Sequence, residues 1–154
     1  MLKPQPIFLE ALSKTKGNIP LLVKIGYFGK QKDDLNKLLN AIHKYADGVC
    51  AINTIPAKVV DKKGKQILPG SPVRLSSGTC GATIRWAGME MAKYIVDYKR
   101  EKKWKDFVVI GVGGVVTPKD YFEYMKVGVN AVQSATGAMW KPSLALEIRE
   151  LANK

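Results

Sequence analysis

The feature that most constrains the fold of this chain is a regular alternation between short apolar runs and amphipathic segments. Four runs have the length and composition of strands, and they lie at residues 20–25, 48–52, 107–110 and 130–133. A continuous apolar run of this length is typical of a strand buried on both faces of a parallel sheet. We expect the first three runs, residues 20–25 included, to be buried in this way.

The segments between these runs have the three- and four-residue spacing of amphipathic helices. In residues 31–46 the apolar positions are Leu35, Leu38, Leu39, Ile42 and Tyr45. Further helices are expected at residues 6–16, 82–101 and 142–152, and between Thr117 and Gly128. Thr117 suits the N-cap of that helix, Pro118 its first position and Asp120 its third, where a carboxylate favours the helix dipole.

Strands that alternate with helices imply right-handed βαβ units and a parallel sheet, so the predicted fold class is α/β. We expect one domain over residues 1–154, with an insert at residues 56–72 that carries a small hairpin between residues 59–60 and 66–68. No run approaches the roughly 20 apolar residues of a membrane span. Residues 1–10 lack the pattern of a signal peptide, and we therefore expect a cytoplasmic protein with no membrane partner.

The charge balance favours anionic ligands. The chain holds 25 Lys and Arg against 13 Asp and Glu, a formal net charge of +12 at pH 7. Lysines cluster at residues 30–32, 62–65 and 99–105, but no helix-turn-helix, zinc-finger or RRM pattern accompanies them. Such clusters are typical of a solvated surface, so we expect no nucleic-acid partner. Two cysteines and one histidine form neither a disulfide framework nor a zinc site, so we expect no metal.

Polar residues and glycines follow the predicted strands at the points where they end. They are Lys24, Asn53-Thr54, Gly113-Gly114 and Thr136-Gly137. Because ligands of parallel α/β folds bind at the carboxyl ends of the strands, we expect these residues to share one site. Taken singly each has a simpler explanation: Lys24 can extend its ammonium to water, and Asn53 can form a turn before Pro56. Cys50 is most simply a small buried apolar residue.

The glycines after the third strand fit none of the common nucleotide motifs. Val116 stands where the dinucleotide pattern GxGxxG needs its last glycine, and no Gly-Lys-Ser/Thr follows, as a P-loop requires. Gly113-Gly114 still lets backbone N–H groups approach an anion closely, and Ala135-Thr136-Gly137 repeats the arrangement one βα unit later. Two such loops match the phosphate position of (β/α)8 barrels, after strands 7 and 8. The alternative is a pair of tight βα turns.

An ordered set of motifs points to a family. The segments Val23-Lys24-Ile25, Ala51–Ile55, Ser77–Arg85, Ile110–Val115 and Val132–Thr136 together resemble the C-terminal half of the dihydroorotate dehydrogenases. The resemblance covers about residues 20–145. It implies half of a (β/α)8 TIM barrel, strands 5–8 with their helices, from an FMN-dependent enzyme.

The resemblance also implies residue roles. Lys24 matches a lysine beside the flavin, Ile52 matches a backbone position at the flavin, and Gly81 matches a loop glycine that lies close to it. Asn53 and Thr54 match the pair that hydrogen-bonds the substrate pyrimidine, whose alternating donors and acceptors suit an amide and a hydroxyl. The two loops that hold the FMN phosphate correspond to Gly113-Gly114 and Ala135-Thr136.

Four residues depart from the family pattern. Ser77 and Ala135 replace frequent glycines, Cys80 replaces serine or glycine, and Trp86 replaces a frequent proline. Ala135 still has its N–H, so we expect these departures to affect phosphate binding less than the conformation of the loop before residue 82. The family base is a Cys or Ser in the N-terminal half, so we treat Cys80 as a loop residue and the catalytic residue of this chain as unknown.

The resemblance therefore implies a fragment, subunit or truncated relative of a dihydroorotate dehydrogenase-like oxidoreductase, incomplete alone. The family reaction oxidises dihydroorotate to orotate and transfers hydride to flavin N5. One alternative is an enzyme similar to dihydropyrimidine dehydrogenase that acts on uracil or thymine, and another is a non-catalytic half-barrel that binds phosphate or protein. Two unpaired sheet edges would favour a complementary N-terminal half-barrel chain or a homo-oligomer as partner.

Overall fold

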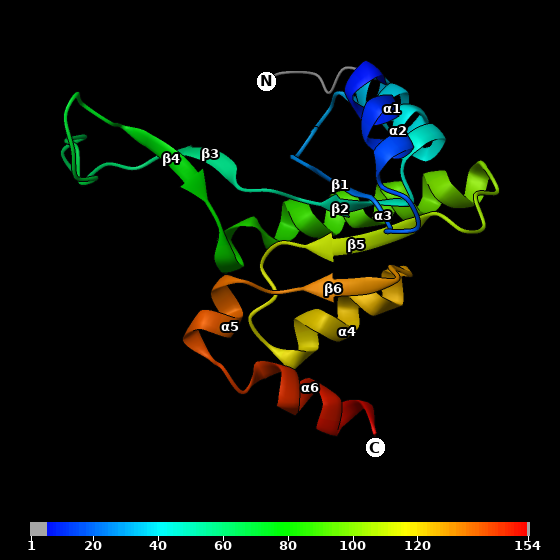
Figure 1. Ribbon diagram of the computed structural model, residues 1–154. Coiled ribbons are helices and arrows are strands. Elements are labelled where there is room, and N and C mark those ends of the chain that lie inside the picture. The colour runs from blue at the N-terminus through cyan, green and yellow to red at the C-terminus, as the bar shows by residue number, and fades with distance from the viewer. Residues whose placement is uncertain (1–5, 154) are drawn as a thin grey trace.

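The structure is a computed structural model that describes residues 6–153, so the ends of the expected 1–154 domain lie outside it. Its centre is a four-stranded parallel sheet in the order β1-β2-β5-β6 (Figure 1). The strands are β1 (Leu22–Ile25), β2 (Gly48–Ala51), β5 (Val108–Val112) and β6 (Ala131–Gln133). The predicted α/β fold with parallel strands is confirmed.

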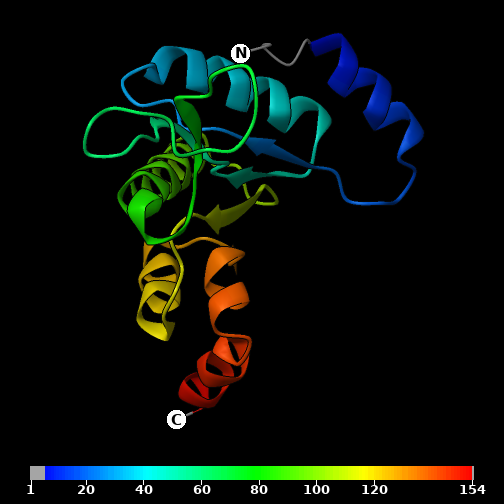
Figure 2. The ribbon, with the colours of Figure 1, turned by 90° about the vertical axis from the view of Figure 1, so that its left-hand side faces the viewer.

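Helices cover one face of this sheet. The long helices are α1 (Pro6–Thr15), α2 (Lys32–Tyr45), α3 (Arg85–Glu101), α4 (Pro118–Val127) and α6 (Leu144–Ala152). Figure 2 shows α2, α3 and α4 side by side around the outer side of the strands. A 3-10 turn, η1 (Gly81–Ile84), precedes α3, and α5 (Thr136–Trp140) is a short helix that the sequence analysis did not predict. No helix within residues 6–153 is long and apolar enough to cross a membrane.

The core lies between the helices and the sheet. Leu35, Leu39 and Ile42 of α2 are fully buried, and Val49 and Val109 meet them from the central strands. The α2 spacing predicted from the sequence therefore marks its buried stripe. Burying one such side chain stabilises a fold by about 1.5–3 kcal/mol.

The expectation that residues 20–25 form a strand buried on both faces is wrong. Val23 and Ile25 pack toward the core, but Leu22 is 39% exposed and Lys24 is exposed as well. β1 is an outer strand, and alternate side chains of a strand point to opposite faces. A continuous apolar run does not encode the position of a strand within its sheet.

The sheet face opposite the helices is open at both margins. Lys24 shares a register row with Cys50, Ile110 and Ala131 across the four strands. The two central residues of this row are buried, whereas Lys24 and Ala131 are exposed. The outer edges of β1 and β6 pair with no further strand within residues 6–153.

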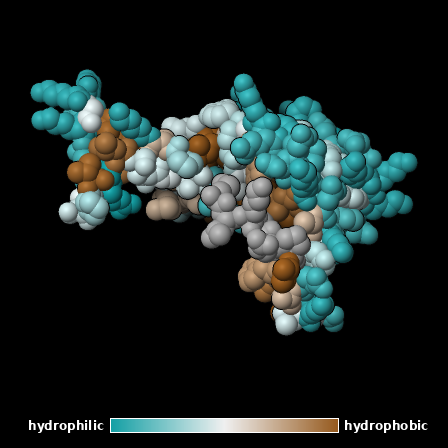
Figure 3. All heavy atoms as spheres, turned by 90° about the horizontal axis from the view of Figure 1, so that it is seen from above, coloured by the Kyte–Doolittle hydropathy of each residue, from teal (hydrophilic) through white to brown (hydrophobic). Residues whose placement is uncertain are grey.

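The insert between β2 and α3 is a projecting antiparallel ribbon. β3 (Ile55–Lys58) pairs with β4 (Ser76–Thr79), and a single bridge joins Val60 to Gln66 farther out. This bridge lies within residues 56–72, where a small hairpin is expected, whereas the longer β3–β4 pairing was not predicted. The ribbon extends away from the sheet (Figure 1), and apolar side chains lie among its cations (Figure 3).

The ends of α4 form as the sequence predicts. The Thr117 side chain accepts a hydrogen bond from the Asp120 N–H, and the Asp120 carboxylate accepts one from the Thr117 N–H. Pro118 occupies the first turn, and Gly128 ends the helix with φ of 101°. This reciprocal capping box satisfies N–H groups that otherwise have no partner at a helix start.

Candidate functional site

A cavity of about 290 Å³ lies at the carboxyl ends of the four parallel strands. Lys24 of β1 and residues at or after the ends of β2, β5 and β6 line it, as do residues of the loop that precedes α3. All nine residues singled out from the sequence are among them: Lys24, Ile52, Asn53, Thr54, Gly81, Gly113, Gly114, Ala135 and Thr136. Parallel strands bring their carboxyl ends to one edge of the sheet, which explains this convergence of distant segments.

The first wall of the cavity follows β1 and β2. The Ile52 N–H donates to the Val112 carbonyl at 2.8 Å, and the Asn53 N–H donates to the Ile25 carbonyl at 2.9 Å. These bonds continue the sheet beyond the strands and fix the backbone below exposed Asn53 and Thr54 side chains. Asn53 thus presents an amide at the cavity from a well-anchored backbone.

Lys24 is the cation of this wall. Its side chain is exposed, and it lies close enough to the Cys50 thiol to influence that group. Burial raises the pKa of the Cys50 thiol, and the positive charge of Lys24 opposes the increase. The thiol donates to the Gln133 amide oxygen at 3.3 Å, so it is a neutral group beneath the cavity.

The loop from β4 to α3 forms the opposite wall. Gly81 has φ of 75°, and a Cβ there would lie 3.2 Å from the Thr136 methyl carbon. The Thr136 hydroxyl donates to the Cys80 sulfur at 3.3 Å. These contacts join the loop before α3 to the loop after β6. Cys80 is an exposed loop residue, as expected, and it lines the cavity.

The loop after β5 brings glycine backbone to the cavity. Gly113 and Gly114 have φ of 130° and 73°, and a Cβ on Gly114 would lie 2.4 Å from the Arg85 Cβ. Only glycine fits this close approach with that backbone conformation. Among the hydrogen bonds of residues 6–153, none is donated by the N–H groups of Gly113, Gly114 or Val115. The loop therefore offers consecutive free donors to an anion.

The backbone N–H groups at the start of α4 are not free in the same way. Asp120 Oδ2 accepts from the N–H groups of Val116 and Thr117 at 3.1 and 2.8 Å, and the Thr117 hydroxyl caps the Asp120 N–H. The helix therefore satisfies these N–H groups with its own side chains. The donors available for a ligand are those of the preceding glycine loop.

Several lining residues were not identified from the sequence. Gln133 and Ser134 end β6 at the cavity, and Ile84 and Met139 add apolar surface. The Ser134 hydroxyl donates to the Val115 carbonyl at 2.6 Å and so ties the two glycine-bearing loops together. Gln133 occupies an open-face position of its strand, a placement that alternation along the strand could have indicated.

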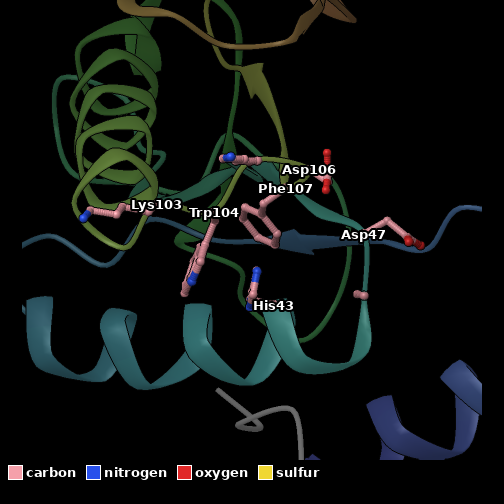
Figure 4. Close-up of a pocket in the computed structure, with 8 residues that line it drawn as sticks. His43, Asp47, Lys103, Trp104, Asp106 and Phe107 are labelled. Carbon is pink, nitrogen blue, oxygen red and sulfur yellow. The ribbon is translucent and has the colours of Figure 1, made fainter.

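A larger hollow of about 420 Å³ lies at the opposite end of the strands, before β2 and β5 (Figure 4). His43 of α2 stacks on Trp104 with ring centroids 4.2 Å apart, and Phe107 packs against both rings. The Asp47 carboxylate there is bonded to Lys16 and to the Leu21 N–H. In parallel α/β folds this end serves stability. None of the predicted site residues lines it.

Comparison of the sequence with known proteins points to one family. The family model described as dihydroorotate dehydrogenase matches residues 4–151. The chain belongs to the dihydroorotate dehydrogenase family. It is 36% identical over 136 residues to a dihydroorotate dehydrogenase of Dictyostelium discoideum, with 84% of this chain and 35% of that protein covered.

Two other relatives carry more specific names. One is the catalytic subunit of dihydroorotate dehydrogenase B (NAD(+)) from Staphylococcus carnosus, 29% identical with 88% of this chain and 40% of that protein covered. The other is a dihydroorotate dehydrogenase (quinone) from Thermosynechococcus vestitus, 30% identical with 93% and 39% covered. The chain thus spans less than half the length of these members of the dihydroorotate dehydrogenase family.

Proposed function

We propose that the cavity at the carboxyl ends of the strands binds FMN, with the phosphate on the glycine loop. The free N–H groups of Gly113, Gly114 and Val115 are the observation that carries this proposal, because they form a set of donors without acceptors. Ala135 and Thr136 line the same cavity from the next loop and would hold the phosphate from the other side. Ile52 and Gly81 also line the cavity, where the flavin ring would lie.

The same cavity would take a dihydropyrimidine substrate, which we propose to be dihydroorotate, oxidised to orotate. When bound, FMN supplies the acceptor for hydride from the saturated ring. Asn53 and Thr54 present an exposed amide and hydroxyl that suit the ring amides of such a substrate. Lys24 supplies a positive charge that stabilises negative charge at the reaction centre. We assign no base among these residues.

We also propose that residues 1–154 are the C-terminal half of a (β/α)8 barrel and act with a complementary half. Relatives are more than twice as long as the region they share with this chain. The cavity of about 290 Å³ is slightly smaller than the roughly 300–1,000 Å³ typical of ligand sites, and the outer edges of β1 and β6 are unpaired within residues 6–153. A second half-barrel would pair both edges and add the missing walls.

The cofactor proposal is tested with the full chain, by titrating FMN and riboflavin and following flavin fluorescence. We expect FMN to bind at least tenfold more tightly than riboflavin, because only FMN has the phosphate. Gly114→Ala should remove this preference, since its Cβ would meet the Arg85 backbone. Gly64→Ala is the matched control: Gly64 also has positive φ, but nothing lies within 4 Å of its Cβ position. Failure of both flavins to bind, to the chain alone and with a complementary half added, would refute the proposal.

The substrate proposal is tested by adding the N-terminal half of a relative as a second chain. Reduction of the flavin by dihydroorotate, with uracil and thymine slower, is the expected result. The reverse preference would assign the site to the uracil or thymine class. A folded, monomeric chain that binds no flavin, alone or with the second half, would favour a non-catalytic half-barrel.

A further inference from the structure

Among the charged residues within residues 6–153, Asp120 alone is buried, with 8% of its surface exposed. Its Oδ2 atom accepts three hydrogen bonds, all from the residues that end the glycine loop. The donors are the Val116 N–H at 3.1 Å, the Thr117 N–H at 2.8 Å and the Thr117 hydroxyl at 2.8 Å. A capping box needs only one of these contacts. The carboxylate therefore fixes the loop as well as the helix.

The other carboxylate oxygen, Oδ1, pairs with Arg85. Arg85 Nε lies 2.6 Å from Asp120 Oδ1, in a close ion pair whose N–H is not aimed as a hydrogen bond requires. Arg85 begins α3, directly after the loop that carries Gly81. Its backbone is also the surface against which Gly114 packs. One carboxylate thus joins the start of α3 to the end of the glycine loop.

We infer that Asp120 is a positioning residue for anion binding: through Arg85 and the Val116 and Thr117 N–H groups it holds the free donors of Gly113–Val115 in place for a phosphate. The inference rests on the proposed function, because it concerns the same cavity. Asp120 is not itself a ligand, since its carboxylate would repel a phosphate. It acts by fixing the carboxyl end of the loop, so that the upstream N–H groups need no reorganisation when an anion binds.

A carboxylate is required here, and an amide of the same shape is not equivalent. If the oxygen of an asparagine faced the loop, its NH2 group would face the Arg85 guanidinium, a donor against a donor. If the NH2 group faced the loop, it would meet the N–H donors of Val116 and Thr117. Burial works against the charged form, but hydrogen bonds from Thr117 and Val116 and the charge of Arg85 outweigh it and keep the Asp120 pKa below its ordinary value.

The test compares Asp120→Asn with Glu123→Gln in the full chain. Glu123 also pairs with the Arg85 guanidinium and lies on the same helix, but it makes no hydrogen bond to the glycine loop. We expect Asp120→Asn to raise the FMN dissociation constant about tenfold, equivalent to roughly 1.4 kcal/mol, and to change that of riboflavin less than twofold. Glu123→Gln should change neither by more than twofold. A merely structural role would weaken both flavins equally, and that result would overturn the inference.

A second measurement keeps the inference testable if no flavin binds, an outcome that by itself counts only against the proposed function. Amide hydrogen exchange of Val116 and Thr117 should accelerate at least tenfold in Asp120→Asn. Amides of α3 that face the core should keep their rates, which shows that the variant remains folded. Unchanged exchange at Val116 and Thr117 would overturn the inference, whatever the flavin titrations give.

Discussion

The contact between Tyr124 and Gly88 allows a sharp test of how buried side chains hold the glycine loop in place. Tyr124 is fully buried on α4, and its hydroxyl donates to the Gly113 carbonyl at 2.8 Å. Gly88 of α3 faces the same hydroxyl, because a Cβ there would lie 2.1 Å from the oxygen. Gly88→Ala therefore cannot be accommodated unless the tyrosine moves. Tyr124→Phe removes the obstructing atom.

Each single change has a magnitude that follows from this geometry. Tyr124→Phe leaves the buried Gly113 carbonyl without its donor and should cost about 1–3 kcal/mol. Gly88→Ala should cost about 1–3 kcal/mol from overpacking, offset by the roughly 1 kcal/mol by which a helix prefers alanine. Two carbonyl oxygens, of Val112 and Gly113, lie 3.0 and 3.1 Å from the new Cβ and remain in both backgrounds.

The double variant isolates the contact. In a double-mutant cycle, the helix propensity of alanine and the contacts with the two carbonyl oxygens cancel, because they are the same with Tyr124 and with phenylalanine. The free energy of unfolding of the double variant should therefore be about 1 kcal/mol higher than the two single changes predict when added. Urea unfolding followed by circular dichroism measures all four proteins. Tyr121→Phe is the matched control, since no hydrogen bond of the Tyr121 hydroxyl occurs within residues 6–153. Additivity within about 0.5 kcal/mol would refute the reasoning.

Three further predictions test the core, the cavity wall and the buried carboxylate. Leu39→Ala should lower the free energy of unfolding by about 2–5 kcal/mol, and Leu38→Ala clearly less, because Leu39 is fully buried and Leu38 only partly so; urea titration decides. Gly78→Ala should shift the Thr54 methyl resonance in NMR spectra, because its Cβ would lie 2.5 Å from the Thr54 hydroxyl oxygen; an unmoved resonance would contradict this. The folded chain holds the Asp120 pKa below its unfolded value, so this stabilisation is complete above about pH 4 and is lost as the pH falls through the folded-state pKa. Asp120→Asn should therefore reduce the decrease in the free energy of unfolding at acid pH, and an unchanged decrease would contradict the assignment.

The features that were predicted best from the sequence are those that depend on adjacent residues or on the direction of the strands. Thr117, Pro118 and Gly128 mark the ends of α4 because caps and left-handed turns depend on adjacent residues. The nine site residues converge on one cavity because parallel strands end at one edge, although their roles stay proposals. The expected cytoplasmic location and absence of a nucleic-acid partner also stay predictions.

Other features depend on contacts that no local pattern carries. The exposure of Leu22 follows from the outer place of β1 in the sheet, which its composition does not reveal. β4 is rich in serine and glycine, which have little strand propensity, and it pairs with residues about 20 positions earlier. α5 contains Thr136 and Gly137, which favour helices poorly, and it is too short to show the apolar periodicity by which helices were predicted.

Within residues 6–153 the outer edges of β1 and β6 are unpaired, so the tendency of this chain to self-associate depends on its fold. An edge strand will pair with any extended backbone, another copy of the same chain included. The net charge of +12 opposes such encounters, and this repulsion extends over about 10 Å at 0.1 M ionic strength but only about 3 Å at 1 M. Added salt should therefore favour self-association of the chain alone. The surplus of positive charge therefore opposes contact between the open edges of two copies of the chain.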